Sequence, residues 1–298
     1  MKMTFKIQFH ANEDGIILRE AIRQQGISSK GLTAIKYRGG NIFVNGEEKN
    51  VRHILAKGDE ITIIFPKEEA SQSLLPEQGD LNIVYEDEAL LIIDKPPFMN
   101  TIPSREHPRG SIANFVYCYF LKQGIPSTIH IVTRLDRDTS GLLCIAKHSH
   151  IHHLMSQQLQ NGQIRKEYEA IVHGHVSKDM SIIAPIGRKD TSIIEREVRE
   201  DGQFAHTDVK VLKRTTYKRE PITHVRLTLH TGRTHQIRVH MAHIGHPLLG
   251  DELYGGSKAL YNRQALHCVY LEMLHPLSKE KLCFSSEVVE SMKKIIHN

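Results

Sequence analysis

Two arginines and two acids alternate in one short stretch of the chain, Arg134-Leu135-Asp136-Arg137-Asp138. The turn-forming residues TSG follow, and then the apolar run LLCIA, which is expected to be a buried strand. This order would present Asp136 at the end of a strand, next to a cleft. An arginine beside a carboxylate favours its charged form, and an ionised carboxylate in a cleft can act as a nucleophile or a base. Taken alone, the stretch is more typical of a surface ion pair.

A second set of candidate residues lies in TGRTHQIRVHMAHIGH, residues 231–246. A glycine and an arginine directly after a strand indicate a tight entry into a helix, which we expect over residues 233–243. Arg233 would then begin the helix, and Arg238 would follow somewhat more than one turn later. Because the first N–H groups of a helix are unpaired, His235 and Arg238 at this end are candidate phosphate contacts.

The bulk composition places the chain among ordinary globular proteins. It has 298 residues, of which 40% are hydrophobic and 24% charged, and its formal net charge is +5. This mild basicity permits a nucleic-acid partner without requiring one. No apolar run reaches the roughly 20 residues that span a bilayer, and the first residues lack a signal-peptide pattern, so we expect no membrane partner and a cytoplasmic location. The four cysteines form no CxxC pair and are expected to be reduced thiols.

Composition along the chain predicts two domains. Residues 1–70 end in an expected strand, residues 71–80 are mostly polar and predict a linker, and residues 81–298 form the larger domain. The larger domain mixes strands and helices without regular alternation, and hairpins are frequent. That pattern predicts an α+β fold with a largely antiparallel sheet and flanking helices.

The segment GISSKGLTAIKYRGGNIFVNGEEKNVRHILAKGDEITI, within the first domain, resembles the alpha-L RNA-binding motif. This small module is also found in a small-subunit ribosomal protein. Cationic residues in the segment could form a face for RNA phosphates. A solvated, mixed-charge surface is the alternative, because acids such as Glu47 and Glu48 are interspersed. The candidate RNA-binding residues here are Lys30, Lys36, Arg38 and Arg52.

Three ordered motifs of the larger domain resemble those of RNA pseudouridine synthases of the RluA/RluD type. They are RLDRDTSGLL, KEYEAIVHG and TGRTHQIRVHMAHIGHPLLGDELYG. With IVYEDEALLIIDKP and SIIEREVREDGQFAHTDVKVL, the resemblance covers most of residues 80–275. It implies a pseudouridine synthase fold with a central cleft, and isomerisation of uridine in RNA without a metal or organic cofactor.

The resemblance also implies residue roles. Asp136 matches the catalytic aspartate, Tyr168 the active-site tyrosine, and Arg233 the arginine that pairs with the aspartate. Arg134 matches the arginine that helps to displace the target base. The chain departs from the family at Thr133, where histidine is frequent. This departure puts local hydrogen bonding and substrate choice in doubt more than the chemistry.

Several alternatives stay open at the level of sequence. The expected substrate is large-subunit ribosomal RNA, because the amino-terminal module is common in that subgroup, with transfer RNA as the alternative. A catalytically inactive, ribosome-associated RNA-binding protein and a nucleoside glycosidase are two further alternatives. Whether Asp136 attacks the sugar or assists proton removal at C2′ is undecided. We expect the protein to be a monomer. His148 and His152 are spaced so that they could bind zinc, but no cysteine or acid lies near at a ligand spacing, so no metal is expected there. No metal is expected at His235, His240, His243 and His246 either, because they belong to the motif that resembles the synthases.

Overall fold

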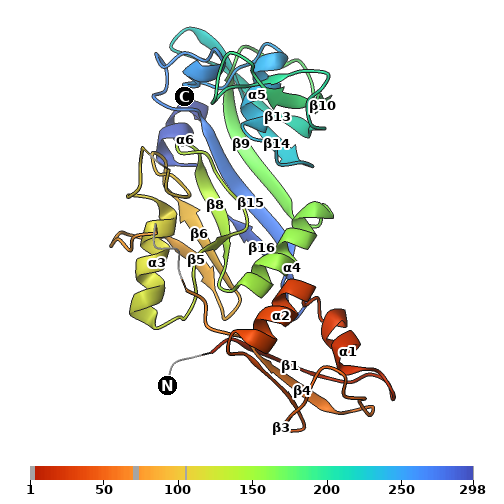
Figure 1. The fold of residues 1–298 in the computed structure, drawn as a ribbon. Helices are drawn as coiled ribbons and strands as arrows, with labels where there is room; N and C mark the ends of the chain where they lie inside the picture. The colour runs from red at the N-terminus through yellow and green to blue at the C-terminus, as the bar shows by residue number, and fades with distance from the viewer. Residues whose placement is uncertain (1–3, 70–73, 105, 298) are drawn as a thin grey trace.

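The structure is a computed structural model that describes residues 4–69, 74–104 and 106–297. In this part of the chain a large mixed sheet has the strand order β10-β13-β14-β9-β15-β8-β6-β5, with β16 beside β15 and β7 beside β8 (Figure 1). All of its pairs are antiparallel except β15 with β8. The strands are β5 (Ile83–Glu86), β6 (Leu90–Lys95), β7 (His130–Ile131), β8 (Ser140–Ala146), β9 (Arg165–His173), β10 (Met180–Ile183), β13 (His206–Tyr217), β14 (Glu220–Leu229), β15 (Leu266–Leu274) and β16 (Lys281–Ser285). The expected α+β fold is confirmed.

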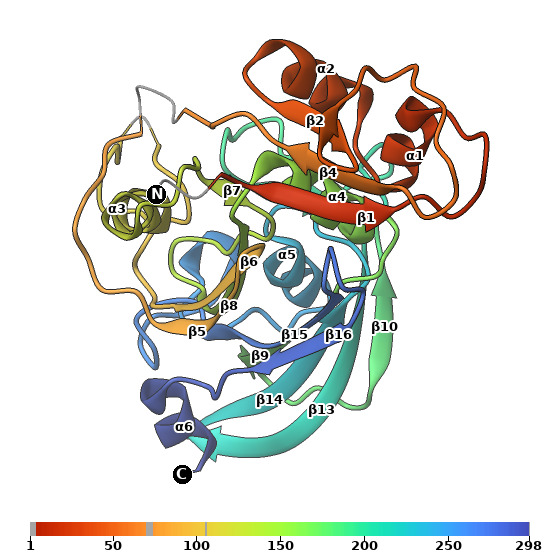
Figure 2. The same ribbon diagram turned by 90° about the horizontal axis from the view of Figure 1, so that it is seen from below.

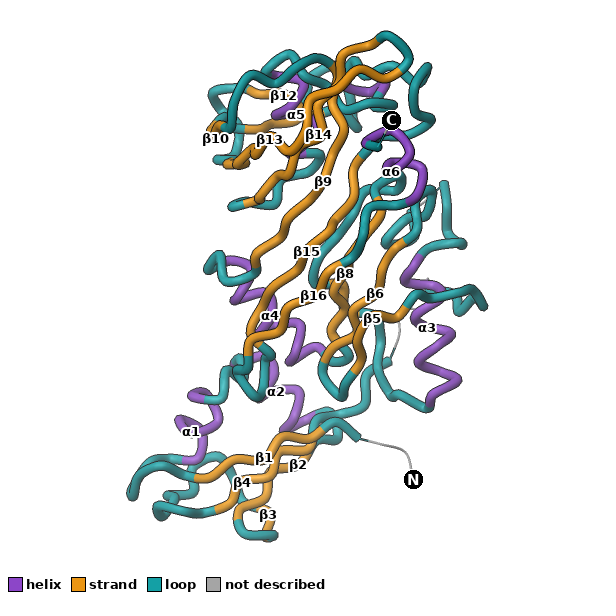
Figure 3. Tube along the Cα trace, turned by 180° about the vertical axis from the view of Figure 1, so that it is seen from behind, coloured by secondary structure: helices purple, strands orange, loops and turns teal. Residues whose placement is uncertain are grey.

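The core of the large domain lies where β8 meets β15. Every residue of β8 is buried, as expected for its apolar run, because strands flank it on both sides and helices cover it. Gly141 has a φ of 109°, and a Cβ there would stand 2.3 Å from the carbonyl oxygen of Cys268 on β15. A side chain at that position would therefore force the parallel pair apart. Figure 3 shows β9 and β15 running side by side along the length of the sheet.

Helices cover the sheet and its ends. They are α3 (Ile112–Gln123), α4 (Ser149–Gln160), α5 (Gln236–His243) and α6 (Glu290–Ile296), with the 3-10 turn η1 (Glu252–Tyr254) and the small hairpin of β11 (Ile186–Arg188) and β12 (Arg196–Val198). α3 buries Ile112, Val116 and Phe120, which recur every four residues and face the core. Within the described ranges, no helix is both long and apolar enough to cross a membrane.

α5 begins later than the sequence predicted. The expected helix over residues 233–243 is wrong in its first turn, because the helix starts at Gln236. His235 precedes it in the left-handed region, with a φ of 56°, which interrupts a right-handed helix. The Gln236 side chain accepts from the backbone N–H of Arg233 and donates to the carbonyl of His206, so residues 231–235 form a turn tied to β13.

The amino-terminal part has a core of its own. It contains β1 (Lys6–His10), α1 (Leu18–Gln24), α2 (Ser29–Tyr37), β2 (Asn41–Val44), β3 (Glu47–Glu48) and β4 (Glu60–Ile64), with the sheet order β1-β4-β2-β3. Ser28 caps α2 by accepting from the N–H of Gly31 at 3.0 Å. The sequence did not reveal β1. Residues 71–73 of the predicted linker lie outside the described residues.

The amino-terminal module packs against the start of α4 (Figures 1 and 2). Phe5 stacks on His148 with ring centroids 4.4 Å apart, and Phe65 stacks on His150 at 5.2 Å. The Glu68 carboxylate accepts from the backbone N–H of Ser149 at 2.9 Å. Burial in this interface lowers the pKa of both imidazoles to about 4. The two histidines therefore have to be neutral while the module is docked.

This burial predicts that acid weakens docking of the module. The ordinary histidine pKa is 6.5 and the docked pKa of His148 and His150 is about 4, so undocking takes up protons below pH 6.5. Docking should be complete above about pH 6.5 and be lost progressively as the pH falls toward 4. Small-angle X-ray scattering should give a larger radius of gyration at pH 5 than at pH 7. A His148→Phe/His150→Phe double variant should remove this response; an equal expansion in the variant would refute the assignment.

Candidate active site

A cleft of about 1350 Å³ opens where the β7–β8 loop faces β9, the end of β14 and the start of α5. The large domain's candidate residues, from three separate motifs, all line it; they are Arg134, Asp136, Tyr168, Arg233, His235 and Arg238. The fold thus brings together side chains that are up to 104 positions apart in the sequence, from 134 to 238.

The loop that carries Asp136 is fixed from behind by hydrogen bonds to its backbone. Carbonyls on either side of the acid accept from side chains of other segments. These bonds join Thr101 Oγ1 to the Leu135 carbonyl at 2.7 Å, Lys95 Nζ to the Arg137 carbonyl at 3.1 Å, and Arg263 Nη1 to the Asp138 carbonyl at 2.8 Å. Asp136 itself is about one-third exposed (31% of its side chain), so it faces the cleft while its loop is held in place.

Lys95 is a functional candidate that the sequence analysis missed. Its side chain is fully buried, and its ammonium also donates to the carbonyls of Pro96 and Met99, both at 2.9 Å. Burial lowers its pKa to about 7. The sequence did hold a signal for Lys95, which is its position at the end of the apolar run LLIIDK. A lysine there is expected to be buried, and a buried cation needs hydrogen-bond acceptors around it.

Arg238 is the cation that pairs with Asp136. Its Nη1 lies 3.0 Å from Asp136 Oδ2, while Nε and Nη2 hold both oxygens of Asp251 at 2.7 and 2.8 Å. Burial alone would lower the pKa of Arg238, but the carboxylates of Asp251 and Asp136 outweigh it and raise the pKa above its ordinary value. The ring of Tyr254 lies against the guanidinium at 4.9 Å. Arg238 is therefore a fixed, permanently charged partner for the acid.

The predicted pairing of Arg233 with Asp136 is wrong in this structure. Arg233 donates from Nε to the carbonyl of Phe204 at 2.9 Å and from Nη1 to Gln203 Oε1 at 3.0 Å. The reason is the late start of α5, which leaves Arg233 in the preceding turn and puts Arg238 in the first helical turn. Arg233 lies at the cleft as a lining residue rather than as the partner of the acid.

Tyr168 reaches the cleft from the middle of β9 and is only 6% exposed. Burial raises the pKa of its phenol well above the ordinary range, and the neighbouring Cys268 and Asp136 act in the same direction. The phenol is therefore neutral at physiological pH. Lys166 lines the same cleft two residues earlier on the strand, and burial lowers its pKa. The sequence analysis passed over Lys166, although it shares the KEYEA motif and the face of Tyr168.

The remaining predicted residues of the large domain occupy the rim and its support. His235 Nε2 lies 3.8 Å from Asp136 Oδ2, and His235 Nδ1 lies 2.8 Å from the hydroxyl of Tyr254. Arg134 is exposed at the mouth of the cleft. Thr133 is buried and accepts from the backbone N–H of Cys144 at 3.0 Å, so it fastens the loop to β8.

The charge of the cleft lining favours an anionic ligand. Six lining side chains are cationic, and two, Asp136 and Asp208, are acidic. The cationic residues are Arg134, Arg137, Arg165, Lys166, Arg233 and Arg238. Such a surface is suited to a phosphate backbone.

On the amino-terminal module, Lys36 and Arg52 border one shallow hollow of about 460 Å³, together with Lys49 and Asn50. Lys30 on α2 and Arg38 at its end are exposed outside this hollow. The structure therefore brings two of the four candidate RNA-binding residues of the module together.

Comparison with known proteins agrees with these features. A family model described as RNA pseudouridylate synthase matches residues 89–243, which is more than half of the chain. The chain belongs to the RNA pseudouridine synthase family. Its motifs are of the RluA/RluD type, and members of this family are isomerases.

The relatives cover nearly the whole chain. A Bacillus subtilis protein named "uncharacterized RNA pseudouridine synthase YjbO" is 46% identical over 94% of this chain and 98% of its own length. The "ribosomal large subunit pseudouridine synthase D" of Pseudomonas aeruginosa is 36% identical over 84% of this chain and 81% of its own length. Among solved structures, human RNA pseudouridylate synthase domain containing 1 superposes with a TM-score of 0.59 at 26% identity. The superposition covers 74% of this chain and 86% of the chain of the human protein.

The contrast between the two arginines gives a prediction for the synthase. Arg238→Lys keeps a cation but cannot hold Asp251 through two bonds and reach Asp136 as well. We expect the single-turnover rate at saturating RNA to fall about a hundredfold, since a misplaced catalytic group costs that much. Arg233→Lys is the matched control and should change this rate by no more than a few-fold. A larger loss in Arg233→Lys than in Arg238→Lys would restore Arg233 as the partner of the acid.

Proposed function

We propose that the chain converts specific uridines of large-subunit ribosomal RNA to pseudouridine, with Asp136 as the catalytic group. The observation that supports this most directly is the position of Asp136: its carboxylate lies in the basic cleft, bound to a buried arginine at 3.0 Å. Formation of pseudouridine requires the glycosidic bond to break, the base to turn, and C5 to bond to C1′. No net oxidation, reduction or hydrolysis occurs, so these residues can act without a redox partner.

The size of the cleft suits a base that has left its helix. A uracil stacked in RNA cannot turn, so the nucleotide has to be extruded into the protein first. A volume of about 1350 Å³ exceeds that of ordinary small-molecule pockets, which leaves room for the target nucleotide and its flanking backbone. Arg134, exposed at the mouth, is placed to occupy the space that the extruded base vacates.

Asp136 and Tyr168 then have different tasks. The Asp136 carboxylate either attacks the sugar or assists removal of a proton at C2′, and both routes free the uracil to turn. Tyr168 offers its ring as a platform for the uracil. Because burial keeps its phenol neutral, Tyr168 is better suited to stacking and hydrogen bonding than to acting as a phenolate base.

Large-subunit ribosomal RNA is the preferred substrate for two reasons. Relatives that are 34–36% identical are named ribosomal large subunit pseudouridine synthase D. The amino-terminal module, which we assign as an RNA-binding domain of residues 1–70 before a catalytic domain of residues 81–298, carries a second basic hollow. Transfer RNA is the alternative substrate. We propose that the synthase acts as a cytoplasmic monomer.

Asp136→Asn should abolish turnover while RNA binding persists, because it removes the charge without changing shape. We expect tritium release from C5-labelled uridine in ribosomal RNA to fall by about 10⁴-fold or more, the scale of losing a catalytic group. Chemical mapping in cells without the gene should show missing pseudouridines in large-subunit ribosomal RNA, restored by the wild-type gene and not by Asp136→Asn.

Three results would separate the alternatives. Missing sites in transfer RNA alone would replace the substrate proposed here. Release of free uracil would indicate a glycosidase, and unchanged turnover in Asp136→Asn would remove the catalytic assignment.

Substitutions in the amino-terminal module are expected to change the affinity for RNA without changing the rate of the chemical step. Lys36→Glu and Arg52→Glu should each weaken RNA binding and lower the slope of log K against log salt by about 1, as loss of one phosphate contact does. The rate at saturating RNA should stay unchanged. Arg23→Glu, on α1 and paired with Glu20 at 3.1 Å, is a control of equal charge change and should leave the slope intact. Equal effects in all three variants would mean that only net charge matters.

A further inference from the structure

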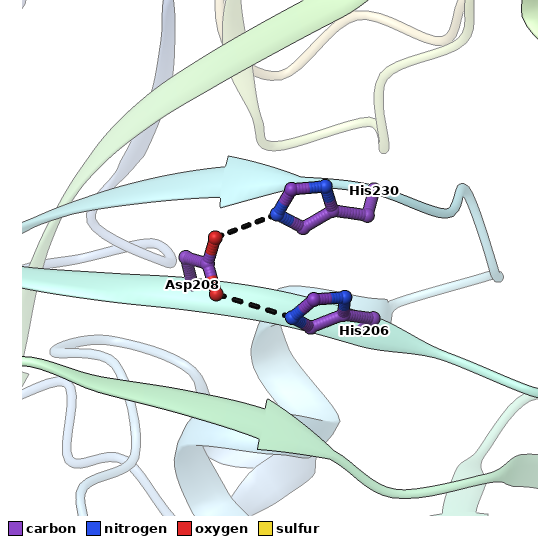
Figure 4. Close-up of side chains that lie close together, drawn as sticks. All are labelled: His206, Asp208 and His230. Atoms are coloured by element: carbon purple, nitrogen blue, oxygen red, sulfur yellow. Dashed lines mark hydrogen bonds and ion pairs between the residues drawn. The ribbon is translucent and has the colours of Figure 1, made fainter.

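Two histidines and an aspartate form a cluster on the large sheet that the reaction does not use. His206 and Asp208 lie two residues apart on β13, so their side chains share one face of the strand. His230 follows β14 directly opposite His206, and its backbone N–H donates to the His206 carbonyl at 3.2 Å. Figure 4 shows both imidazoles directed at the carboxylate between them.

The three side chains offer their ligand atoms at short range. His206 Nε2 lies 3.1 Å from Asp208 Oδ1, and His230 Nε2 lies 2.6 Å from Asp208 Oδ2. All three ligand atoms lie within 4.8 Å of one another, and the two rings are stacked 4.1 Å apart at 18°. Two imidazole nitrogens and one carboxylate oxygen from adjacent strands are a donor set for a borderline divalent metal.

The surrounding structure holds this donor set in place. The Ser181 hydroxyl on β10 donates to Asp208 Oδ1 from the opposite side. The backbone N–H of His206 donates to Thr231 Oγ1 at 3.0 Å, and its carbonyl accepts from Gln236 Nε2 at 2.9 Å. Since the Ser181 and histidine hydrogen bonds lower the pKa of Asp208 to about 2, the carboxylate is ionised at any physiological pH. A hydrogen bond to the ligating carboxylate, such as that from Ser181, is typical of metal sites, and the two bonds to the His206 backbone fix the position of that residue.

We propose that His206, Asp208 and His230 form a binding site for a divalent transition metal of the zinc class. The Asp208 and His230 side chains are 42% and 45% exposed and line the active-site cleft, so further coordination positions are open to water or to an RNA phosphate oxygen. A divalent cation there would take the place of the N–H protons with which His206 and His230 now contact the Asp208 carboxylate. It would also tie β13 to β14 at the turn that carries Arg233 and His235 into the cleft. Magnesium fits poorly, because it prefers oxygen ligands.

The test is zinc binding to the full chain without RNA, by isothermal titration calorimetry after treatment with a chelator. One site should bind zinc more tightly than the chain's other histidines do, and magnesium should not compete. His230→Gln and Asp208→Asn should abolish this site, and Ser181→Ala should weaken it by about tenfold or more. His224→Gln is the matched control, because His224 lies on β14, the strand that His230 follows, and pairs with Glu169 at 2.8 Å; this variant should bind zinc as the wild type does.

A second readout guards against variants that fail to fold. In the wild-type chain, zinc should shift the NMR signals of the His206 and His230 rings together and raise the unfolding temperature. Equal zinc binding in the wild type, His230→Gln and Asp208→Asn would overturn the proposal. So would perturbation of the two rings by inorganic phosphate at pH 6 but not by zinc, which would make the cluster an anion site. Neither readout depends on turnover, so failure here leaves the function assigned to Asp136 untouched.

Discussion

The buried guanidinium of Arg238 is the constraint on which the cleft depends. A cation that is 8% exposed has to be matched by charge and by hydrogen bonds, and two carboxylates from different segments do this. Asp251, 1% exposed, is more deeply buried than Arg238 and holds two guanidinium nitrogens. Removing one member of such a set leaves a buried charge unpaired, at a cost of about 3–5 kcal/mol. The first turn of α5, the loop before η1 and the β7–β8 loop are therefore fixed relative to one another.

The large sheet also helps to fix the loop that carries Asp136. The parallel contact of β8 with β15 is close enough to require glycine at position 141, and it brings Ser140 Oγ within 2.9 Å of His267 Nδ1. Behind the acid, Lys95 and Thr101 hold the carbonyls of its loop, and in front Arg238 holds its carboxylate. Asp136 is thus constrained from both sides before any RNA arrives. Orientation fixed in advance is a large part of what a catalytic site contributes to rate.

Much of this could be predicted from sequence, and the failures have physical causes. The apolar run after Asp136 predicted a buried strand, and the motifs predicted which side chains share one cleft. The choice between Arg233 and Arg238 could not be made from spacing, because it depends on where α5 begins. That start is set by the Gln236 carboxamide, which binds β13, a strand some 30 positions away in the chain. Lys95 was missed because its acceptors are carbonyls of a loop that only the fold places around it.

The exposure of the charged groups matches what the proposed reaction needs. Asp136 is 31% exposed and its arginine 8%, so a sugar can approach the acid while the cation stays shielded. If Asp136 attacks the sugar, the new bond removes its negative charge, and a cation paired with that acid alone would be left uncompensated in a buried site. Arg238 does not meet this problem, since Asp251 still holds it through two bonds of 2.7 and 2.8 Å. If Asp136 reacts in this way, the carboxylate of Asp251 would allow Asp136 to lose and regain its charge during turnover without loss of the geometry around it.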